Sequence, residues 1–392
     1  MTLKQSLHSI WNVAKREIQR LTSKPIYFFC MLIAPALCVV FFLSLMQDGL
    51  PTNLPIAVVD MDGSATSRNL IRQLDAFEQT EVVYKTATFD DARREMQKGN
   101  IYGIFYIPKN FAVEATTGKQ PTLSFYTNGT YLIAASLLFR DMKTISVLAG
   151  ASVGLQTGLA KGYTTDQIMG QLQPVVVDTH AIGNPWLNYS VYLNNTILPG
   201  VLQLMIFLVT VFSIGTEIKY STARQWLQTG GNSLTTSLLG KLLPQTVIFT
   251  IVALMCCAAL YGFNAFPLNS GWMPMISAII LLVLASQAVG VFMIGVLPTL
   301  RLGLSFASLF GMIAFSIVGF SFPVLGMDPT LQALSDLFPL RHYFLIYVDQ
   351  ALNGRDLFYS WSEYVWLAGF LILPFLIGKN LKNALLYFKY IP

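Results

Sequence analysis

The sequence predicts a polytopic α-helical membrane protein with six transmembrane helices and an extracytoplasmic α/β domain inserted between helices 1 and 2. The composition is that of a membrane protein, because only 11% of the 392 residues are charged and 54% are apolar. In an ordinary soluble domain, charged residues make up about 25%. Residues 47–196 indicate the inserted domain, since they are more polar than their flanks and alternate strand and helix signals.

Residues 1–25 predict an amphipathic helix at the cytoplasmic surface of the membrane. Apolar residues recur there three and four positions apart, and basic residues take the opposite side. The apolar positions are Leu3, Leu7, Ile10, Trp11, Ala14, Ile18 and Leu21, and the basic ones are Lys4, Lys15, Arg16 and Arg20.

The uncharged residues 26–46 predict the first transmembrane helix, because a stretch of this length crosses about 30 Å of hydrocarbon. A cleaved signal peptide has a shorter apolar core and a small-residue cleavage site, and the sequence after Met46 has no such site. We therefore expect this helix to be retained.

Residues 197–378 predict transmembrane helices 2–6, and residues 379–392 a cytoplasmic tail. The five helices are expected at 197–216, 242–262, 273–297, 302–322 and 361–378, the last interrupted by Pro374. Their short connections differ in basic residues, with twelve Lys and Arg on the side of the termini and two, Arg341 and Arg355, on the other. The twelve are Lys4, Lys15, Arg16, Arg20, Lys24, Lys219, Arg224, Lys241, Arg301, Lys379, Lys382 and Lys389. The positive-inside rule then places both termini in the cytoplasm and the insert outside.

The insert predicts alternating strands and helices, which is typical of an α/β domain. Strands are expected at 54–60, 81–85, 101–107 and 121–126, and helices at 64–77 and 89–98. The proline-free stretch 130–173 predicts a helical stalk, and 174–179 a further strand.

Cysteine, histidine and charge patterns argue against several kinds of site. Cys30, Cys38, Cys256 and Cys257 fall in apolar runs, so we expect them to pack rather than to bind metal, and the three histidines are scattered singly. The basic residues collect beside apolar runs, which indicates membrane topology and not a nucleic-acid surface. We expect no metal and no cofactor bound by this chain.

Asp60 to Ser64 resembles the D-x-D-G-[ST] loop of haloacid-dehalogenase-type phosphatases, in which the first carboxylate attacks phosphorus. Such a site needs further acids and a lysine to hold magnesium. Asp90 and Asp91 are candidates, but they stand at an expected helix start, where carboxylates are favoured. The favoured interpretation is a polar turn, and a membrane-anchored phosphatase using Asp60 and Asp62 stays an alternative.

No energy source is predicted within the chain. The sequence has no G-x-x-x-x-G-K-[ST] loop, because Gly240-Lys241 is followed by Leu242. Residues 242–300 hold no Asp, Glu, Lys or Arg, and Glu363 is expected at the membrane interface, so ion coupling is disfavoured. We expect a transport subunit that is not an enzyme. Its loop 217–241 suits either an amphipathic helix seated in a partner's groove or a solvated connecting helix.

Residues 217–227 and 238–244 resemble the coupling-helix region of permeases of the type 2 class of ATP-binding-cassette (ABC) exporters. Those permeases carry an acid-rich stretch, a Gly-Thr pair, a Gln-Leu step and a closing Gly-Lys; here Ser221-Thr222 replaces Gly-Thr, Lys219 replaces a common acid, and Gly230 replaces a Thr-Pro pair. The resemblance implies a site that couples the permease to an ATPase. Its residues are Glu217, Lys219, Thr222, Arg224, Gln225, Trp226, Gly240 and Lys241.

Residues 319–343 are similar to the segment after the fifth span in the multidrug-efflux-like subfamily of these permeases, which implies re-entrant helices near the outer leaflet over 323–345. The residues themselves predict a partly buried hairpin, since prolines break its helices. The implied outer-gate residues are Phe322, Pro323, Pro329, Pro339, Arg341 and His342. For Arg341 and His342, headgroup anchoring and substrate contact are both open.

The insert resembles the large external domain of the same subfamily, in Val59–Asp62 and in Gly103–Pro108 followed by Asn110-Phe111. The resemblance thus covers nearly the whole chain. It implies a bacterial inner-membrane permease subunit that exports hydrophobic or amphiphilic, drug-like or lipid-like compounds. The implied partners are a cytoplasmic ATPase that binds ATP and Mg, a second permease copy or sister permease, membrane lipids and, in double-membraned bacteria, a periplasmic adaptor. A non-transporting receptor or secretion-accessory protein is the other alternative.

Overall fold

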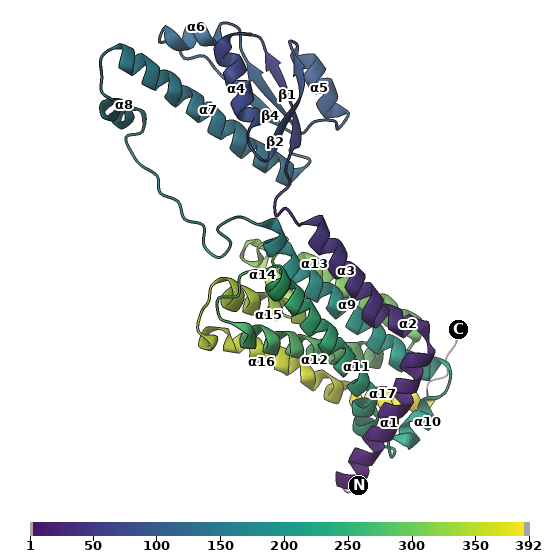
Figure 1. The fold of residues 1–392 in the computed structure, drawn as a ribbon. Helices are drawn as coiled ribbons and strands as arrows, with labels where there is room; N and C mark the ends of the chain where they lie inside the picture. The colour runs from purple at the N-terminus through teal and green to yellow at the C-terminus, as the bar shows by residue number, and fades with distance from the viewer. Residues whose placement is uncertain (1–2, 388–392) are drawn as a thin grey trace. The chain divides into compact units, whose positions relative to one another are not determined.

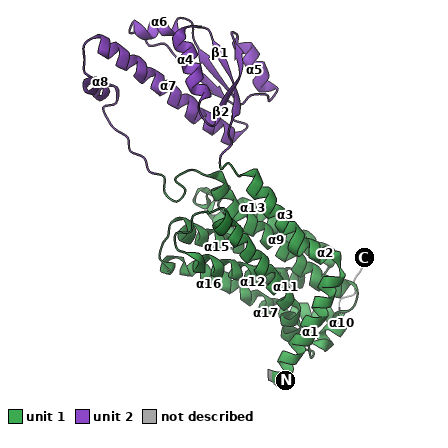
Figure 2. Cartoon of the chain, viewed as in Figure 1, with its two compact units in different colours: residues 1–49, 181–392 green, residues 50–180 purple. Residues whose placement is uncertain are grey.

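The computed structural model describes residues 3–387, so Lys389 lies outside the described residues. The chain forms two compact units (Figures 1 and 2). One unit contains the chain up to Gly49 and from Ala181 onward, and the other is Leu50–His180. The two are treated separately below.

Six helical stretches of the described residues are long and apolar enough to cross a membrane. Three of them are single helices: α9 (Tyr189–Lys219), α12 (Trp272–Val296) and α13 (Leu300–Ile317). The first stretch, Pro25–Leu45, consists of α2 (Pro25–Phe28), a π-helical turn and α3 (Ala34–Leu45). The other two are Leu234–Phe263, which begins with α11 (Leu234–Cys257), and Leu357–Tyr387, which contains α16 (Trp361–Gly369) and α17 (Leu373–Tyr387). An additional helix, α1 (Leu3–Ser23), precedes the first.

Several helix ends differ from the sequence-based expectation. Helix α9 begins at Tyr189 instead of residue 197, because the Asn188 side chain caps it by accepting the backbone N–H of Val191. Helix α13 ends at Ile317 instead of 322, and Gly319 follows with a positive φ of 115°. The expected tail from residue 379 continues helix α17 as far as Tyr387, because Leu381 and Leu385 are buried in the helical core.

Helix α9 forms the centre of the helical unit, where it packs against α3, α11, α12 and α13. Its buried residues lie on all sides, as expected for a helix surrounded by others. Pro199 lies inside α9 without ending it. The last membrane-length stretch does change its helical type, at Phe370–Ile372 directly before Pro374, which agrees with the predicted interruption.

The unit Leu50–His180 contains a four-stranded sheet in the order β2-β1-β3-β4. Strand β1 (Leu54–Asp60) pairs in parallel with β2 (Thr80–Thr86) and β3 (Gly103–Ile107), and β4 (Ser124–Thr127) pairs antiparallel with β3. Residues Ile56–Val59 are all buried, because α4 (Ala65–Asp75) and α7 (Leu132–Ala160) cover one face and α5 (Phe89–Gln97) the other.

The prediction that residues 130–173 form a helical stalk is wrong. Helix α7 packs on the sheet, with Leu138, Met142 and Ile145 in the same buried cluster as Phe105. Helix α8 (Thr165–Leu172) lies against the other half of α7, where Gly158 accommodates Ile168. The apolar face of α7 therefore belongs to the domain core.

The expected strand at 174–179 is also wrong. These residues form no regular secondary structure, and Val175, Val176 and Val177 are exposed. A run of β-branched residues becomes a strand only when a neighbouring strand supplies hydrogen bonds.

Candidate coupling site and outer segment

Five charged side chains, which we call the ion cluster, meet at one end of the helical unit. Arg16, Glu17 and Arg20 come from α1, Glu217 from the last turn of α9, and Lys241 from the second turn of α11. Lys241 and Glu217 have 0% exposed side chains and Glu17 has 1%. Buried charges are costly unless they are paired, so this arrangement requires a complete set of partners.

The ion pairs of the cluster share their partners. Lys241 Nζ lies 2.7 Å from Glu17 Oε2 and 3.0 Å from Glu217 Oε1. The Arg16 guanidinium donates to both carboxylate oxygens of Glu217, at 2.7 and 3.0 Å. Arg20 also donates to Glu217. The two-point geometry of Arg16 is the strong form of an arginine–carboxylate pair.

Neutral side chains complete the hydrogen bonding of the cluster. Glu17 Oε1 accepts from Ser213 Oγ at 2.8 Å and from Gln245 Nε2 at 3.0 Å. Thr222 donates its hydroxyl to Glu217. Every carboxylate oxygen of Glu17 and Glu217 thus has at least one donor.

Helix α1 reaches the cluster because it packs tightly on α11. Its packed face is Val13, Ala14, Glu17 and Leu21, all buried. A Cβ atom on Gly240 would lie 2.6 Å from the Ile10 carbonyl oxygen, so only glycine permits this approach of the two helices. Gly240, expected in the coupling set, therefore has a packing role.

The predicted faces of α1 need correction. Of its expected apolar stripe, Leu7, Trp11 and Ile18 are exposed and Ala14 and Leu21 are buried. The exposed apolar residues suit a membrane surface. Arg16 and Arg20, expected on a solvated basic side, turn toward Glu217. Burial lowers the pKa of Arg16, but its hydrogen bonds to Glu217 and the negative charges of Glu217 and Glu17 together outweigh this and leave the pKa above the ordinary value.

Helix α10 (Ala223–Thr229) lies between α9 and α11 and is attached to both. At the start of α10, the Thr222 hydroxyl donates to Glu217. In the middle of α10, buried Trp226 donates Nε1–H to the Ser237 carbonyl oxygen at 3.3 Å. Lys241 Nζ lies 5.0 Å from the centroid of the Trp226 ring. Ser221, in the turn before α10, has a positive φ of 57°. Glycine adopts that conformation without strain, which fits the Gly-Thr pair that the resemblance implies at this position.

The structure divides the predicted coupling residues into two groups. Glu217, Trp226, Gly240 and Lys241 are buried and Thr222 is half-buried. Lys219, Arg224 and Gln225 are exposed, as is Gln228, which sequence reasoning did not select. Glu217, Thr222, Trp226 and Lys241 attach α10 to α9 and α11. Arg224, Gln225 and Gln228 form the outward face of α10, whereas Lys219 is the last residue of α9.

Sequence reasoning also missed Glu17, Ser213 and Gln245. One signal was available: Glu17 is the acid of a basic helix and stands in the same stripe as Val13, Ala14 and Leu21. An acid within an apolar stripe requires a buried partner.

The segment after α13 consists of short helices broken at prolines. It contains a turn at Val324–Gly326, α14 (Pro329–Ser335) and α15 (Pro339–Ile346). Phe322, Pro323 and Pro329 are exposed, whereas Pro339 is buried. The Asp328 carboxylate accepts the backbone N–H of Thr330 at 2.9 Å, which caps α14 and lowers the pKa of Asp328.

His342 and Glu363 fasten α15 to α16. His342 Nδ1 lies 2.7 Å from Glu363 Oε2, its Nε2 lies 2.9 Å from the Asp336 carbonyl oxygen, and its ring stacks on Trp366. Both ring nitrogens are therefore engaged within the chain. Glu363, for which an interfacial position is expected, is the partner of His342.

Arg341 is half-buried and binds the end of α13. Its Nη1 donates to the Val318 carbonyl oxygen at 2.8 Å, a favourable place for a cation. Burial lowers the pKa of Arg341. Its Nε has no hydrogen-bond partner in the part of the chain that the structure describes.

The phosphatase-like loop has the hydrogen bonding of a turn. Asp60 Oδ1 accepts the backbone N–H groups of Asp62 and Gly63, both at 3.0 Å, and Oδ2 accepts Ser67 Oγ–H at 2.8 Å. Ser64 caps α4. Both oxygens of the would-be nucleophile are thus used locally, which supports the turn interpretation.

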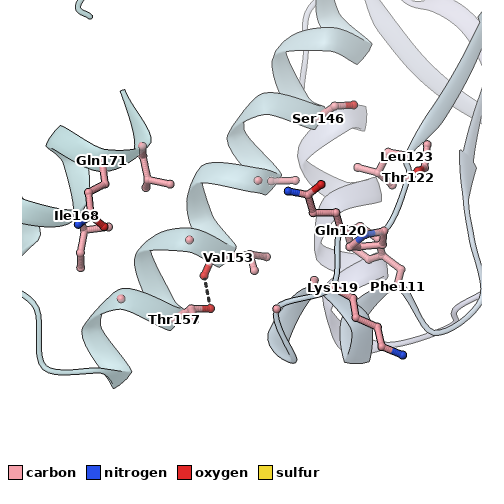
Figure 3. Close-up of a pocket in the computed structure, with 18 of the residues that line it drawn as sticks. Phe111, Lys119, Gln120, Thr122, Leu123, Ser146, Val153, Thr157, Ile168 and Gln171 are labelled. Atoms are coloured by element: carbon pink, nitrogen blue, oxygen red, sulfur yellow. Dashed lines mark hydrogen bonds between the residues drawn. The ribbon is translucent and has the colours of Figure 1, made fainter. Parts of the chain in front are cut away.

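A cavity of about 860 Å³ lies within the unit Leu50–His180. Figure 3 shows its lining, which includes Val153 and Thr157 of α7, Ile168 of α8, and Lys119 and Gln120 from the chain between α6 (Phe111–Thr116) and β4. Its lysines, Lys119 and Lys161, are exposed. None of its lining residues is a buried charged group, and we assign it no ligand.

Comparison with known proteins identifies the family. The sequence pattern of ABC-2 family transporter proteins matches residues 25–378. The linearmycin resistance permease protein LnrN of Bacillus subtilis (strain 168) is 29% identical over 155 residues, a match that spans 40% of this chain and 38% of LnrN. The family match covers most of the chain, including all of α9 to α13 and the ion-cluster residues Glu217 and Lys241. The chain therefore belongs to the ABC-2 family of transporter proteins and is a multi-pass membrane permease.

Proposed function

We propose that this chain is the membrane subunit of an ATP-driven exporter, and that α10 transmits movement from a separate cytoplasmic ATPase to the membrane helices. The observation that carries this proposal is the ion cluster. It joins α1, α9 and α11 around the attachment points of α10. A displacement of α10 must therefore move three helices together.

The outward face of α10 supports docking of a partner. Arg224, Gln225 and Gln228 are exposed on a short helix whose opposite side is fixed by Trp226 and Leu227. A short amphipathic helix with a rigid seat suits a groove on another protein. ATP and Mg bind to that ATPase, and this chain binds no cofactor of its own.

The distribution of exposed basic residues supports the proposed orientation. Arg16, Arg20 and Lys241 belong to the ion cluster, but Lys4, Lys15, Lys219, Arg224, Arg301, Lys379 and Lys382 are exposed beside helix ends expected on the same side. These exposed basic residues still outnumber the two basic residues, Arg341 and Arg355, of the opposite connections. We place the termini and α10 in the cytoplasm, residues 50–180 outside, and the chain in a bacterial inner membrane.

The exported compounds are proposed to be hydrophobic or amphiphilic, either drug-like or lipid-like. The name of LnrN, a resistance permease, supports this class. The complete transporter then pairs this chain with a second copy or a sister permease. Residues 50–180 offer the surface for a periplasmic adaptor.

Affinity purification from native membranes tests the function. Tagged wild-type chain should recover a protein with an ATP-binding-cassette motif, and Arg224→Glu should reduce its recovery. Arg301→Glu is the matched control, because Arg301 is another exposed arginine at the start of a helix. Wild-type chain that recovers no ATPase contradicts the proposal and favours a non-transporting receptor or secretion-accessory protein.

A further inference from the structure

A membrane-level groove separate from the ion cluster lies between α11, α12 and α17. It has a volume of about 550 Å³, within the range of small-molecule sites. Its apolar walls come from Leu238 and Leu242 of α11, Leu284 of α12, Leu371 in the turn before α17, and Phe375 of α17. Of its lining residues, three carry polar side chains: Thr235, Thr246 and Gln287.

Gln287 is the exceptional residue of this groove. The residue is 3% exposed, and its side-chain Oε1 lies 2.7 Å from Thr246 Oγ1. Among residues 3–387, no hydrogen-bond partner is found for its Nε2. In either orientation of the amide, one polar atom faces Thr246 and the other is left unpaired. An unpaired buried amide in a membrane helix is unfavourable, so a group that enters the groove and hydrogen-bonds to Gln287 is stabilised.

The position of Gln287 defines the shape of the occupant. Its neighbour Thr246 stands twelve residues beyond Leu234, the first groove residue of α11, which corresponds to about 18 Å along the helix. A plain hydrocarbon chain fits the walls but leaves the amide unpaired. A chain with an oxygen partway along its length satisfies both the walls and the amide.

We propose that this groove binds the apolar chain of an amphiphile that carries a hydroxyl or carbonyl oxygen along the chain, and that Gln287 binds that oxygen. This inference deepens the proposed function, on which it rests, by naming a substrate class and a place on the membrane-facing surface where such a compound is held. Gln287 and Thr246 then have a role in substrate binding, and neither residue belongs to the coupling site.

Two substitutions separate the walls from the hydrogen bond. At Gly378, which lines the groove, an added Cβ would lie 3.7 Å from Leu234 Cδ2, an ordinary contact, so Gly378→Leu narrows the groove without a clash at Cβ. Gln287→Leu removes the amide and keeps a similar size. Gly369→Leu is the control, because nothing lies within 4 Å of a Cβ at that position and Gly369 is outside the groove.

Photolabelling of the full-length protein in lipid nanodiscs tests the proposal. The probes are photoactivatable derivatives of 12-hydroxystearic acid and of stearic acid, and labelled residues are mapped by mass spectrometry. Wild-type protein should be labelled on the groove residues of α11 and α17, about fivefold more by the hydroxylated acid, the effect of one neutral hydrogen bond. Gln287→Leu should abolish the difference between the probes, Gly378→Leu should reduce labelling by both, and Gly369→Leu should change neither.

Equal labelling of wild-type protein by the two probes overturns the hydrogen bond to Gln287. The proposed site is overturned if the groove residues are not labelled, or if Gly378→Leu leaves their labelling unchanged. A lack of groove labelling is also the result expected if a second copy of the chain covers the groove. The labelling needs no ATPase. Failure to recover an ATPase with normal labelling therefore rejects the proposed function alone, and recovery of an ATPase without groove labelling rejects this inference alone.

Discussion

Lys241 Nζ lies 2.7 Å from Glu17 Oε2, although the two residues are 224 positions apart in the sequence. This contact joins the amphipathic helix α1 to the start of α11, and the shared partner Glu217 extends it to α9. The end of the helical unit that carries α10 is therefore held by charge as well as by apolar packing.

Lys241→Met should destabilise the protein strongly. The substitution leaves Glu17 and Glu217 buried with less compensation, which costs about 3–5 kcal/mol when one partner of a buried pair is lost. Thermal unfolding of the detergent-solubilised protein measures the effect. The double variant Glu17→Gln with Lys241→Met should recover part of the loss, and a double variant as unstable as the single one would contradict the pairing of these two residues.

Gly240→Leu should displace α1 from α11. The new Cβ would meet the Ile10 carbonyl oxygen at 2.6 Å, and overpacking of this kind costs about 1–3 kcal/mol. The measurement is limited trypsin digestion, in which cleavage after Arg16 and Arg20 should become faster. At Gly369, an added Cβ would have no described atom within 4 Å, so Gly369→Leu should leave the cleavage rate unchanged. Equal rates in wild type and Gly240→Leu would argue against the close helix contact.

Glu363→Leu should loosen α15 from α16. It removes the partner of His342 Nδ1 and leaves a buried polar atom unpaired, at a cost of about 1–3 kcal/mol. Glu363→Gln keeps an oxygen at the same place and should cost less. Thermal unfolding compares the two variants, and an equal effect of both would show that the hydrogen bond to His342 contributes little.

The cap of α14 should weaken in acid. The Thr330 N–H lowers the pKa of Asp328, so the ionised cap contributes stability above the unfolded value of about 3.9, and this contribution is lost as the pH falls through the lower folded pKa. Hydrogen exchange at Thr330, corrected for intrinsic rate, should show less protection at pH 3 than at pH 6. In Asp328→Asn, protection should not change over this range; a wild-type protection independent of pH would contradict the cap.

The sequence predicts the helices of this protein better than their partners. Long uncharged stretches locate the six membrane-length helices. The presence of Glu217, Trp226 and Lys241 within residues 217–241 marks this loop as a candidate coupling site. The ion cluster was missed because its other acid, Glu17, is surrounded by basic residues in α1, which suggest a solvated face. The place of Glu17 within an apolar stripe indicates a buried partner, but nothing local identifies that partner as Lys241, 224 positions away.

Other errors have similar physical causes. Residues 130–173 have helical character, but only the sheet-facing position of Leu138 and Met142 reveals that α7 belongs to the domain core and is not a stalk. The valines at 175–177 have strand propensity without a neighbouring strand. Glu363 and His342 were treated separately because nothing in the sequence brings α15 and α16 together.

The most direct test of the central claim is photocrosslinking from the outward face of α10 in native membranes. A photoreactive amino acid replaces Gln228, which is exposed on α10, and as a control replaces Leu309, which is an exposed apolar residue in the middle of α13. We predict an adduct between position 228 and an ATP-binding-cassette ATPase, and none from position 309. Absence of an ATPase adduct from position 228, in membranes where the chain is folded and abundant, would contradict the claim that α10 couples this permease to ATP hydrolysis.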